Sequence, residues 1–359
     1  MVVFVPGMCE TPTHGGSEAI LYSFAINRLI RSCWKYTIKR GATCPQLQSQ
    51  CIAITTTPTT PSSAAPLPLD TRQSLAKMLL TKTINGTEIS YDTAGYATGP
   101  PIVLLTGWAH DLQLYDLVLP HLAHKFNVIR INWRGHGPSR DPIPDFGVAE
   151  QVSDTIALLD ALDVDTFYLV SHSHGGWAAL GLVEKLCSSS SSRILSLFMI
   201  DQIMTDPPPE FAAGLTTMQD KASWKAARAG LFASWLAGSD DAAVRDHFAY
   251  SFGRFGYDMW ALSCRVIAGA YAEHGNPMKR MEALAAERGG KICPIRHVFS
   301  HPRGDEAYRA RHESFQSGKG SGWFSWRDLG CATHFPSLDC PGVVAGEIAE
   351  FVEGLSRES

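Results

Sequence analysis

The sequence lacks any run of 18 uncharged apolar residues, the length that a helix needs to cross a bilayer. It also lacks a basic excess in its larger part. Residues 1–77 hold seven of the 31 Lys and Arg and three of the 35 Asp and Glu, so the remainder carries a formal charge of −8. An acidic body has no electrostatic reason to bind nucleic acid. We therefore expect no membrane span and no nucleic-acid partner.

No Cys-x-x-Cys pair occurs among the nine cysteines, which are odd in number and scattered along the chain. This pattern excludes a zinc knuckle and a secreted disulfide scaffold, and it is typical of reduced thiols in an intracellular protein. We expect a cytoplasmic location. The composition, 45% hydrophobic and 18% charged over 359 residues, fits a globular enzyme with one large α/β domain and an appendage.

Acidic residues are missing between Glu18 and Asp70, although residues 28–40 contain five Lys and Arg. Residues 55–69 form a Thr/Pro/Ser/Ala linker that cannot build a packed core. We predict an N-terminal extension over residues 1–77 and a catalytic domain over 78–359. The extension is open to two interpretations, a mitochondrial transit peptide or a disordered leader ahead of a true start near Met78.

Segments with strand and helix patterns alternate through the domain, which predicts a mostly parallel central sheet with helices on both faces. A hairpin is expected over residues 83–91 because of its Asn-Gly turn. Residues 207–287 show no strand pattern, and we predict that they form a helical cap. The further elements expected are strands at 102–105, 126–131, 166–170, 194–200, 295–299 and 323–326, and helices near 114–122, 149–162, 176–183 and 343–355.

The most informative motif is Ser171-His172-Ser173-His174-Gly175-Gly176, which lies between a predicted strand and a predicted helix. A serine on a sharp strand-to-helix turn is the nucleophile elbow of the α/β-hydrolase fold. The usual first glycine of that elbow is missing, and a histidine stands on each side of the serine. This departure is more informative than the match itself.

Three residues follow the chain order Ser, Asp, His of that fold, namely Ser173, Asp201 and His334. Each comes just after a predicted strand or in a late loop, where open α/β sheets bind ligands. His334 can accept a proton, and Asp201 can orient its ring and stabilise the imidazolium. Asp305, which follows the next strand, is the alternative acid.

Ser173 has two interpretations. As a nucleophile it would attack an acyl carbon, with the backbone N–H groups of Trp108 and His174 as the oxyanion hole. Alternatively, its hydroxyl only orients a bound oxygen. His110, His172 and His174 could in principle hold a metal, but no nearby carboxylate completes a ligand set. We therefore predict no metal site, and a polar lining for a flat, oxygen-bearing heterocycle.

Four tryptophans could line such a pocket, and we expect this of Trp108 and Trp235 rather than of Trp133 and Trp177. The turn at residues 134–137, Arg-Gly-His-Gly, is common in this fold and is interpreted as structural.

These motifs together resemble the cofactor-independent 2,4-dioxygenases that act on 3-hydroxy-4-oxoquinolines and 3-hydroxy-4-oxoquinaldines. The matching segments lie in order between about residues 83 and 356. The His-Ser-His elbow combined with Gly-Trp-x-His-Asp is the specific part. The segments are Gly107–Asp111, Asn132–Gly137, Ser171–Trp177, Leu231–Leu236, Arg265–Ile267, Pro294–His297 and Thr333–Pro336.

The resemblance implies a mechanism without metal or flavin. His334, held by Asp201, takes the proton of the substrate 3-hydroxyl, and the anion reacts directly with O2. The ring then opens with loss of carbon monoxide and leaves an N-acylanthranilate. Ser173 orients the substrate in this scheme. Substrate and oxygen are contacted by Trp108, His110, His172, His174 and Trp235.

The resemblance also implies that Asp201 rather than Asp305 is the acid, and that the partners are an aromatic heterocycle and O2. A monomer is expected. Two departures, Gln202 and Ala109, would reshape the pocket without removing a required group. The alternatives are a serine esterase or amide hydrolase that uses Ser173, Asp201 and His334, and a hydrolase-like binding protein or an enzyme that cleaves other carbon–carbon bonds.

Overall fold

The computed structural model describes residues 79–138, 143, 145–187, 192–237, 239–250, 252, 256–302 and 304–358. The predicted extension at residues 1–77 lies outside this part of the chain. The division into extension and catalytic domain therefore stays a prediction. Within the described residues, no helix is both long and apolar enough to cross a membrane.

One eight-stranded sheet organises the domain, with the strand order β1-β2-β4-β3-β5-β6-β7-β8. The pairs from β4 to β8 along this order are parallel, whereas β2 runs antiparallel to β1 and β4. This is the predicted α/β-hydrolase fold with a mostly parallel sheet. The strands are β1 Leu80–Ile84, β2 Thr87–Gly95, β3 Pro101–Leu105, β4 Asn127–Ile131, β5 Phe167–His172, β6 Ile194–Ile200, β7 Ile295–Phe299 and β8 Phe324–Asp328.

The predicted hairpin is confirmed. Ile84 pairs with Thr87, and Asn85 and Gly86 form the two-residue turn with φ values of 50° and 78°. Positive φ at both positions is what an Asn-Gly turn supplies at low steric cost. The hairpin closes one edge of the sheet.

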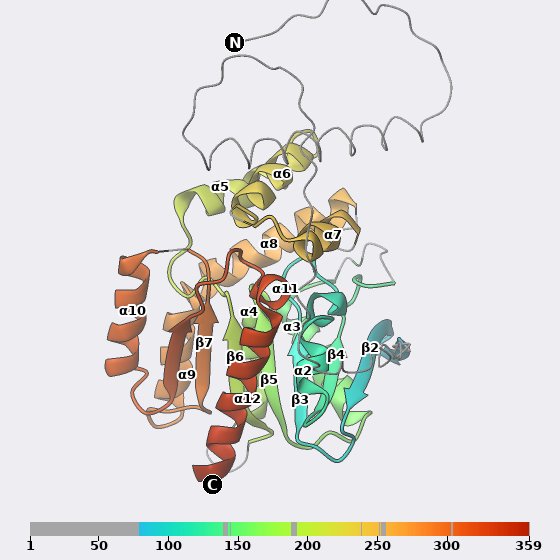
Figure 1. Ribbon diagram of the computed structural model, residues 1–359. Helices are drawn as coiled ribbons and strands as arrows, with labels where there is room; N and C mark the ends of the chain where they lie inside the picture. The colour runs from blue at the N-terminus through green and yellow to red at the C-terminus, as the bar shows by residue number, and fades with distance from the viewer. Residues whose placement is uncertain are drawn as a thin grey trace, which may run out of the picture. The chain divides into compact units, whose positions relative to one another are not determined.

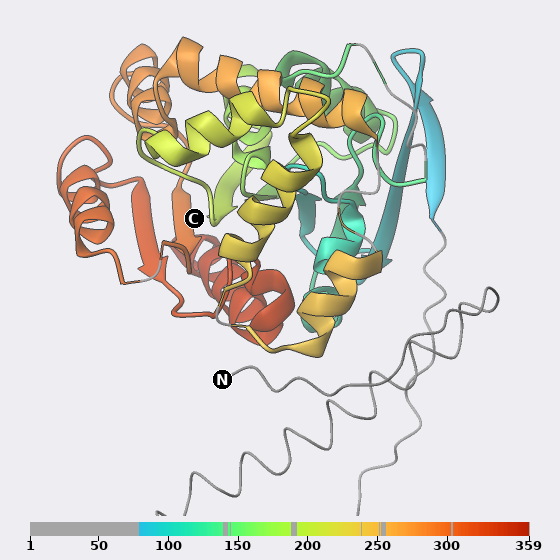
Figure 2. The same cartoon turned by 90° about the horizontal axis from the view of Figure 1, so that it is seen from above.

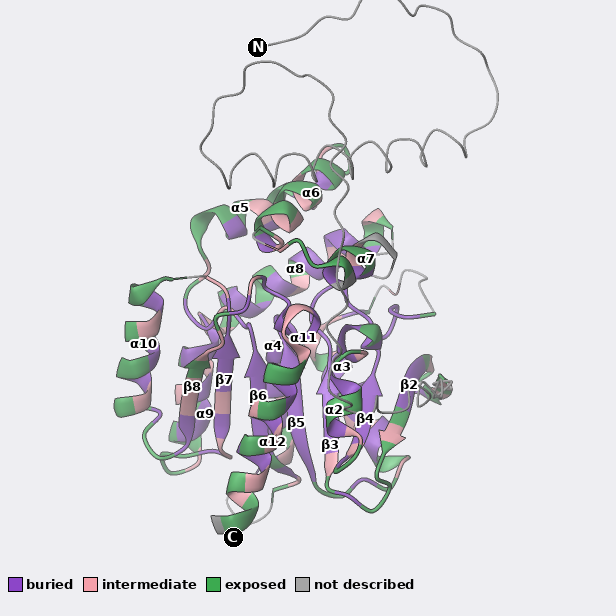
Figure 3. Cartoon of the chain, in the orientation of Figure 1, coloured by how far each residue is buried: buried purple, intermediate pink, exposed green. Residues whose placement is uncertain are grey.

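Helices cover both faces of the sheet. On one face α2 packs with α12, and on the other α3, α4 and α9 pack together (Figures 1 and 2). The central strands of the sheet are buried, whereas the edge strands and the outer sides of the helices carry exposed residues (Figure 3). The helices beside the sheet are α2 Leu119–Leu122, α3 Val148–Asp160, α4 Gly175–Leu186, α9 Pro277–Glu287, α10 Glu306–Ser317 and α12 Pro341–Glu358, and the short helix α11 Pro336–Asp339 contacts α7, η1 and α12.

Further helices between β6 and β7 occupy the segment on which the sequence predicts a cap. Figure 1 shows α5 to α8 over one end of the sheet. Their side chains reach the loops that follow the parallel strands, as the contacts of Trp235 below show. They are α5 Pro209–Thr217, α6 Trp224–Trp235, α7 Ala242–Tyr250 and α8 Tyr257–His274.

The single helix expected near residues 114–122 is instead two short pieces, the 3-10 helix η1 Leu112–Tyr115 and α2. Pro120 lies in the first turn of α2. Proline lacks the N–H that a continuous helix needs at that position, so α2 begins just before it. Asp111 caps η1 by accepting the Gln113 N–H at 3.0 Å.

Candidate active site

Ser173 occupies a strained turn between β5 and α4, with a φ of 48°. Such a backbone conformation is costly for a residue with a side chain and is characteristic of the nucleophile elbow. The turn is fixed because the Ser173 N–H donates to the Ile200 carbonyl at 2.7 Å. Position 175, the first residue of α4, must be glycine, since a Cβ there would lie 2.3 Å from the Thr106 carbonyl oxygen.

His334 and Ser173 meet although 161 residues separate them. Nε2 of His334 lies 3.0 Å from Oγ of Ser173, and Nδ1 of His334 lies 3.5 Å from Oδ1 of Asp201. All three side chains are buried. The structure therefore brings together the three residues that the chain order predicts.

Asp201 follows β6 in a second strained turn, also with a φ of 48°. Its carboxylate accepts the backbone N–H groups of Ser300 at 3.1 Å and His301 at 2.9 Å. Burial raises the pKa of Asp201, and the two N–H donors act against this by stabilising the charged form. The alternative acid, Asp305, is the N-cap of α10 and accepts the Tyr308 N–H at 2.9 Å.

The imidazole of His334 is neutral at neutral pH. Burial lowers its pKa from 6.5 to about 3, because a charged ring would lose its hydration. A neutral ring can accept a proton, and Asp201 is placed to stabilise the imidazolium that results. This pair is an acid–base couple whose proton-accepting nitrogen faces Ser173.

The other elbow histidines surround this couple but do not converge on one point. His172 Nε2 lies 3.0 Å from the His334 carbonyl oxygen, and His110 Nδ1 lies 3.2 Å from His247 Nε2. Burial lowers the pKa of His172 and His174 to about 3. In the described residues, the one group of potential metal ligands with converging atoms is elsewhere, at Cys331, Asp339 and Cys340.

The backbone N–H groups of Trp108 and His174 are candidate donors for a negatively charged oxygen. Within the described part of the chain, no hydrogen bond joins the N–H of Trp108 or His174 to a protein acceptor. His174 is the N-cap of α4, so the positive end of a 12-residue helix lies here. A cavity of about 20 Å³ adjoins Gly107, Trp108 and His174, but it extends toward Trp133 and Trp177, and its lining does not include Ser173, His334 or Trp235.

Side chains of the cap pack against His334 and Trp108. The Trp235 ring of α6 lies 4.9 Å from the His334 ring, and Trp108 packs against Trp235 at 6.3 Å and Trp260 at 4.9 Å. Trp133, in contrast, donates its Nε1–H to the Thr106 carbonyl at 2.9 Å and so anchors the start of the loop that carries Trp108.

A family model described as the alpha/beta hydrolase fold matches residues 100–265. The 2-heptyl-3-hydroxy-4(1H)-quinolone dioxygenase of Mycobacteroides abscessus is 48% identical over 77% of this chain and 99% of that enzyme. The 1H-3-hydroxy-4-oxoquinoline 2,4-dioxygenase of Pseudomonas putida is 33% identical over 75% of this chain and 98% of that enzyme. The chain belongs to this family of quinolone ring-cleaving dioxygenases.

Solved structures agree. A variant of the quinolone-cleaving enzyme AqdC in complex with its substrate matches with a TM-score of 0.72 at 47% identity, over 77% of this chain and 100% of that chain. A 1H-3-hydroxy-4-oxoquinoline 2,4-dioxygenase matches with a TM-score of 0.70 at 32% identity, over 76% of this chain and 99% of that chain. The predicted fold and family are thus both confirmed.

Three further side chains of the dioxygenase lie beside these histidines, although the sequence did not single them out as site residues. His247 of α7 pairs with His110, and Phe252 lies 4.2 Å from the His110 ring. Phe335 packs against both His110, at 5.1 Å, and His334, at 5.0 Å. The cap segment had no motif to mark the first two, whereas the adjacency of Phe335 to His334 was a usable signal.

The turn at Arg134–Gly137 is structural, as interpreted. Arg134 pairs with Asp145 at 2.5 Å and with Asp154 at 2.7 Å. A groove of about 960 Å³ lies among α3, α4, α8 and α9 of the dioxygenase. Its lining includes Trp177 and His274 but not Ser173, Asp201 or His334.

Proposed function

We propose that this dioxygenase cleaves the heterocyclic ring of 2-alkyl-3-hydroxy-4(1H)-quinolones with O2 and releases carbon monoxide and an N-acylanthranilate. The observation that carries the proposal is the buried, neutral His334 whose Nε2 faces Ser173 at 3.0 Å, within a family of quinolone dioxygenases. The name of the Mycobacteroides abscessus relative supports the 2-alkyl substituent.

The first step is a proton transfer. The substrate 3-hydroxyl binds beside Ser173 and gives its proton to Nε2 of His334. Asp201 then stabilises the imidazolium through Nδ1, from a carboxylate that two backbone N–H groups already hold in place. General-base catalysis of this kind contributes roughly 10²- to 10⁴-fold to a rate. It creates the electron-rich anion that the next step needs.

The second step forms and breaks carbon–oxygen and carbon–carbon bonds. The substrate anion donates electrons to O2, and a peroxide forms at C2 and closes onto C4. The ring then opens, C3 leaves as carbon monoxide, and the two oxygen atoms remain on C2 and C4 as the amide carbonyl and the carboxylate. One substrate and one O2 thus give one N-acylanthranilate and one carbon monoxide. The N–H group of Trp108, in the loop after β3, and that of His174, at the start of α4, stabilise the developing negative oxygen.

Ser173 positions the substrate in this proposal and forms no covalent bond. His110, His172, His174 and Trp235 contact the heterocycle. Nδ1 of His172 and of His174 and Nε2 of His110 are buried atoms without a hydrogen bond to another described residue, and so remain for a ligand.

A serine esterase is the second candidate, because the contact between Ser173 and His334 and the strained elbow also suit a covalent hydrolase. The two candidates differ in their products. The full-length protein, freed of metal, is incubated with 2-heptyl-3-hydroxy-4(1H)-quinolone while O2 uptake and carbon monoxide release are recorded. We expect the two gases in equal amounts. Cleavage of p-nitrophenyl esters with no gas signal would contradict the proposal and support the esterase.

A further inference from the structure

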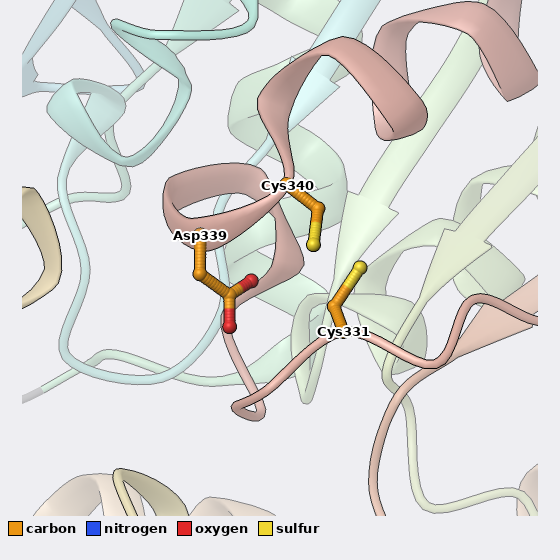
Figure 4. Close-up of side chains that lie close together, drawn as sticks. All are labelled: Cys331, Asp339 and Cys340. Carbon is orange, nitrogen blue, oxygen red and sulfur yellow. The ribbon is translucent and has the colours of Figure 1, made fainter. Parts of the chain in front are cut away.

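Two cysteines and one aspartate meet at the ends of the loop that carries His334. Cys331 lies after β8, whereas Asp339 ends α11 and Cys340 follows it directly. One ligand atom of each residue, two thiol sulfurs and a carboxylate oxygen, lies within 4.8 Å of the others. Figure 4 shows the three side chains turned toward one another between α11 and the preceding loop.

This set has the chemistry of a site for a thiophilic cation. Thiolate and carboxylate are ligands of Zn²⁺, with Zn–S distances of about 2.3 Å and Zn–O distances of about 2.1 Å. A tetrahedral arrangement at these lengths separates ligand atoms by roughly 3.5–3.8 Å. Since the present separations are at most 4.8 Å, they need to contract by up to about 1.3 Å.

The burial of the three residues also suits such a site. Cys331 is buried, while Asp339 and Cys340 are half-buried. A cation can therefore enter from the side of Cys340, and water can supply the fourth ligand. A site with three protein ligands and a water is a known arrangement for Zn²⁺.

Asp339 is anchored in a way that leaves one oxygen for a ligand. Its Oδ2 accepts the Thr333 N–H at 2.7 Å, directly before His334. Its Oδ1 is buried and makes no hydrogen bond of ordinary geometry with a described residue, and the Cys340 thiol and the Ala332 N–H lie near the carboxylate. A cation bound through Oδ1 would keep the bond to Thr333 and so would not disturb the loop.

We propose that Cys331, Asp339 and Cys340 bind a divalent cation of the zinc class, which clips together the two ends of the His334 loop. Binding forms two metal–sulfur bonds and one metal–oxygen bond and releases the two thiol protons to solvent. The cation takes no part in the oxygen chemistry. It stabilises the folded state, because it binds the native loop and not the unfolded chain.

Cobalt(II) is the probe, since thiolate coordination gives it a charge-transfer absorption that free Co²⁺ lacks. The full-length protein, kept reduced by a phosphine, is titrated with Co²⁺. We expect a thiolate band that saturates at one equivalent, and its loss in Cys340→Ser and in Cys331→Ser. Cys340 is half-buried, so Cys340→Ser is expected to fold even if Cys331→Ser does not.

Two controls separate this site from the other thiols. Replacing Cys9, Cys33, Cys44 and Cys51 together by serine removes the thiols of the extension, and Cys293→Ser removes a half-buried thiol elsewhere in the domain. The band should survive both changes. Zn²⁺ should raise the melting temperature of the wild type and of both controls but not that of Cys340→Ser. A band that survives Cys340→Ser, or no band at all in the wild type, would overturn the proposal.

Discussion

The indole of Trp235 lies against the imidazole of His334, with ring centroids 4.9 Å apart and ring planes 34° apart. The Trp235 carbonyl also accepts the His334 backbone N–H at 3.3 Å. Helix α6 of the cap is therefore tied twice to the loop that carries the base. Because Trp235 lies directly against the His334 ring, we expect it to move when a bicyclic quinolone brings its oxygen to Nε2.

Trp235→Ala removes the ring and leaves the backbone bond. We expect kcat/KM for the quinolone to fall roughly 5-fold, since an aromatic pair contributes about 1 kcal/mol. Steady-state O2 uptake measures the change. Trp224→Ala is the matched control, because Trp224 is a buried tryptophan of the same helix that packs against Tyr257 and Trp260. Equal losses in the two variants would mean that general damage to the cap, not the His334 contact, is responsible.

Asp201→Asn keeps the shape of the side chain and removes its charge. The imidazolium formed in the proton transfer then lacks its counter-charge, so kcat should fall on the order of 10²-fold or more. Asp305→Ala is the control. Loss of the α10 N-cap should lower the free energy of unfolding by about 1 kcal/mol and leave kcat near the wild-type value. A larger loss of kcat in Asp305→Ala than in Asp201→Asn would reverse the assignment of the acid.

The fall of kcat/KM at acidic pH reports the pKa of the catalytic base, His334. His334 works only as the neutral imidazole, and burial lowers its pKa from 6.5 to about 3. Its neutral form therefore persists as the pH falls through 6.5. We expect kcat/KM in the wild type to stay flat from pH 8 to below 6.5 and to decline only at more acidic pH. An acid limb centred at or above pH 6.5 would show that the base is not shifted in this direction.

Gly107→Ala tests how closely the loop before Trp108 approaches the elbow. The added Cβ would lie 2.8 Å from the His172 carbonyl oxygen and 3.0 Å from the Ser173 Cβ. We expect overpacking to cost about 1–3 kcal/mol in the free energy of unfolding and to lower kcat by displacing the Trp108 N–H. In Gly346→Ala, within α12, the new Cβ meets nothing within 4 Å and should stabilise the helix by up to about 1 kcal/mol. Urea unfolding and kcat are measured for both variants. If the stability and kcat of Gly107→Ala equal those of the wild type, the loop does not approach the elbow as closely as described.

Much of the fold followed from the sequence because parallel strands buried on both faces are continuous apolar runs. The strand predicted at residues 194–200 matches β6, and the Asn85-Gly86 turn was readable from its residue types alone. The broken helix at residues 112–122 was not predicted, because the apolar spacing continues across the break before Pro120.

The candidate site was predictable where a residue type at a strand end carries the chemistry, as with Ser173, Asp201 and His334. It was not predictable where backbone groups act. The N–H donors of Ser300 and His301 hold Asp201, and any residue type could supply them. Cys331 and Cys340 looked unrelated, because eight residues and a short helix separate them and only the folded loop brings their sulfurs together.

The most direct test of the account is anaerobic mixing of each enzyme with 2-heptyl-3-hydroxy-4(1H)-quinolone, at a pH where the free quinolone is neutral, followed by absorbance. Without O2 the reaction stops after the proton transfer, so the spectrum reports that step alone. We predict that the quinolone anion accumulates on the wild type and on Ser173→Ala, and does not accumulate on His334→Ala. Equal anion formation on His334→Ala and the wild type would contradict the account.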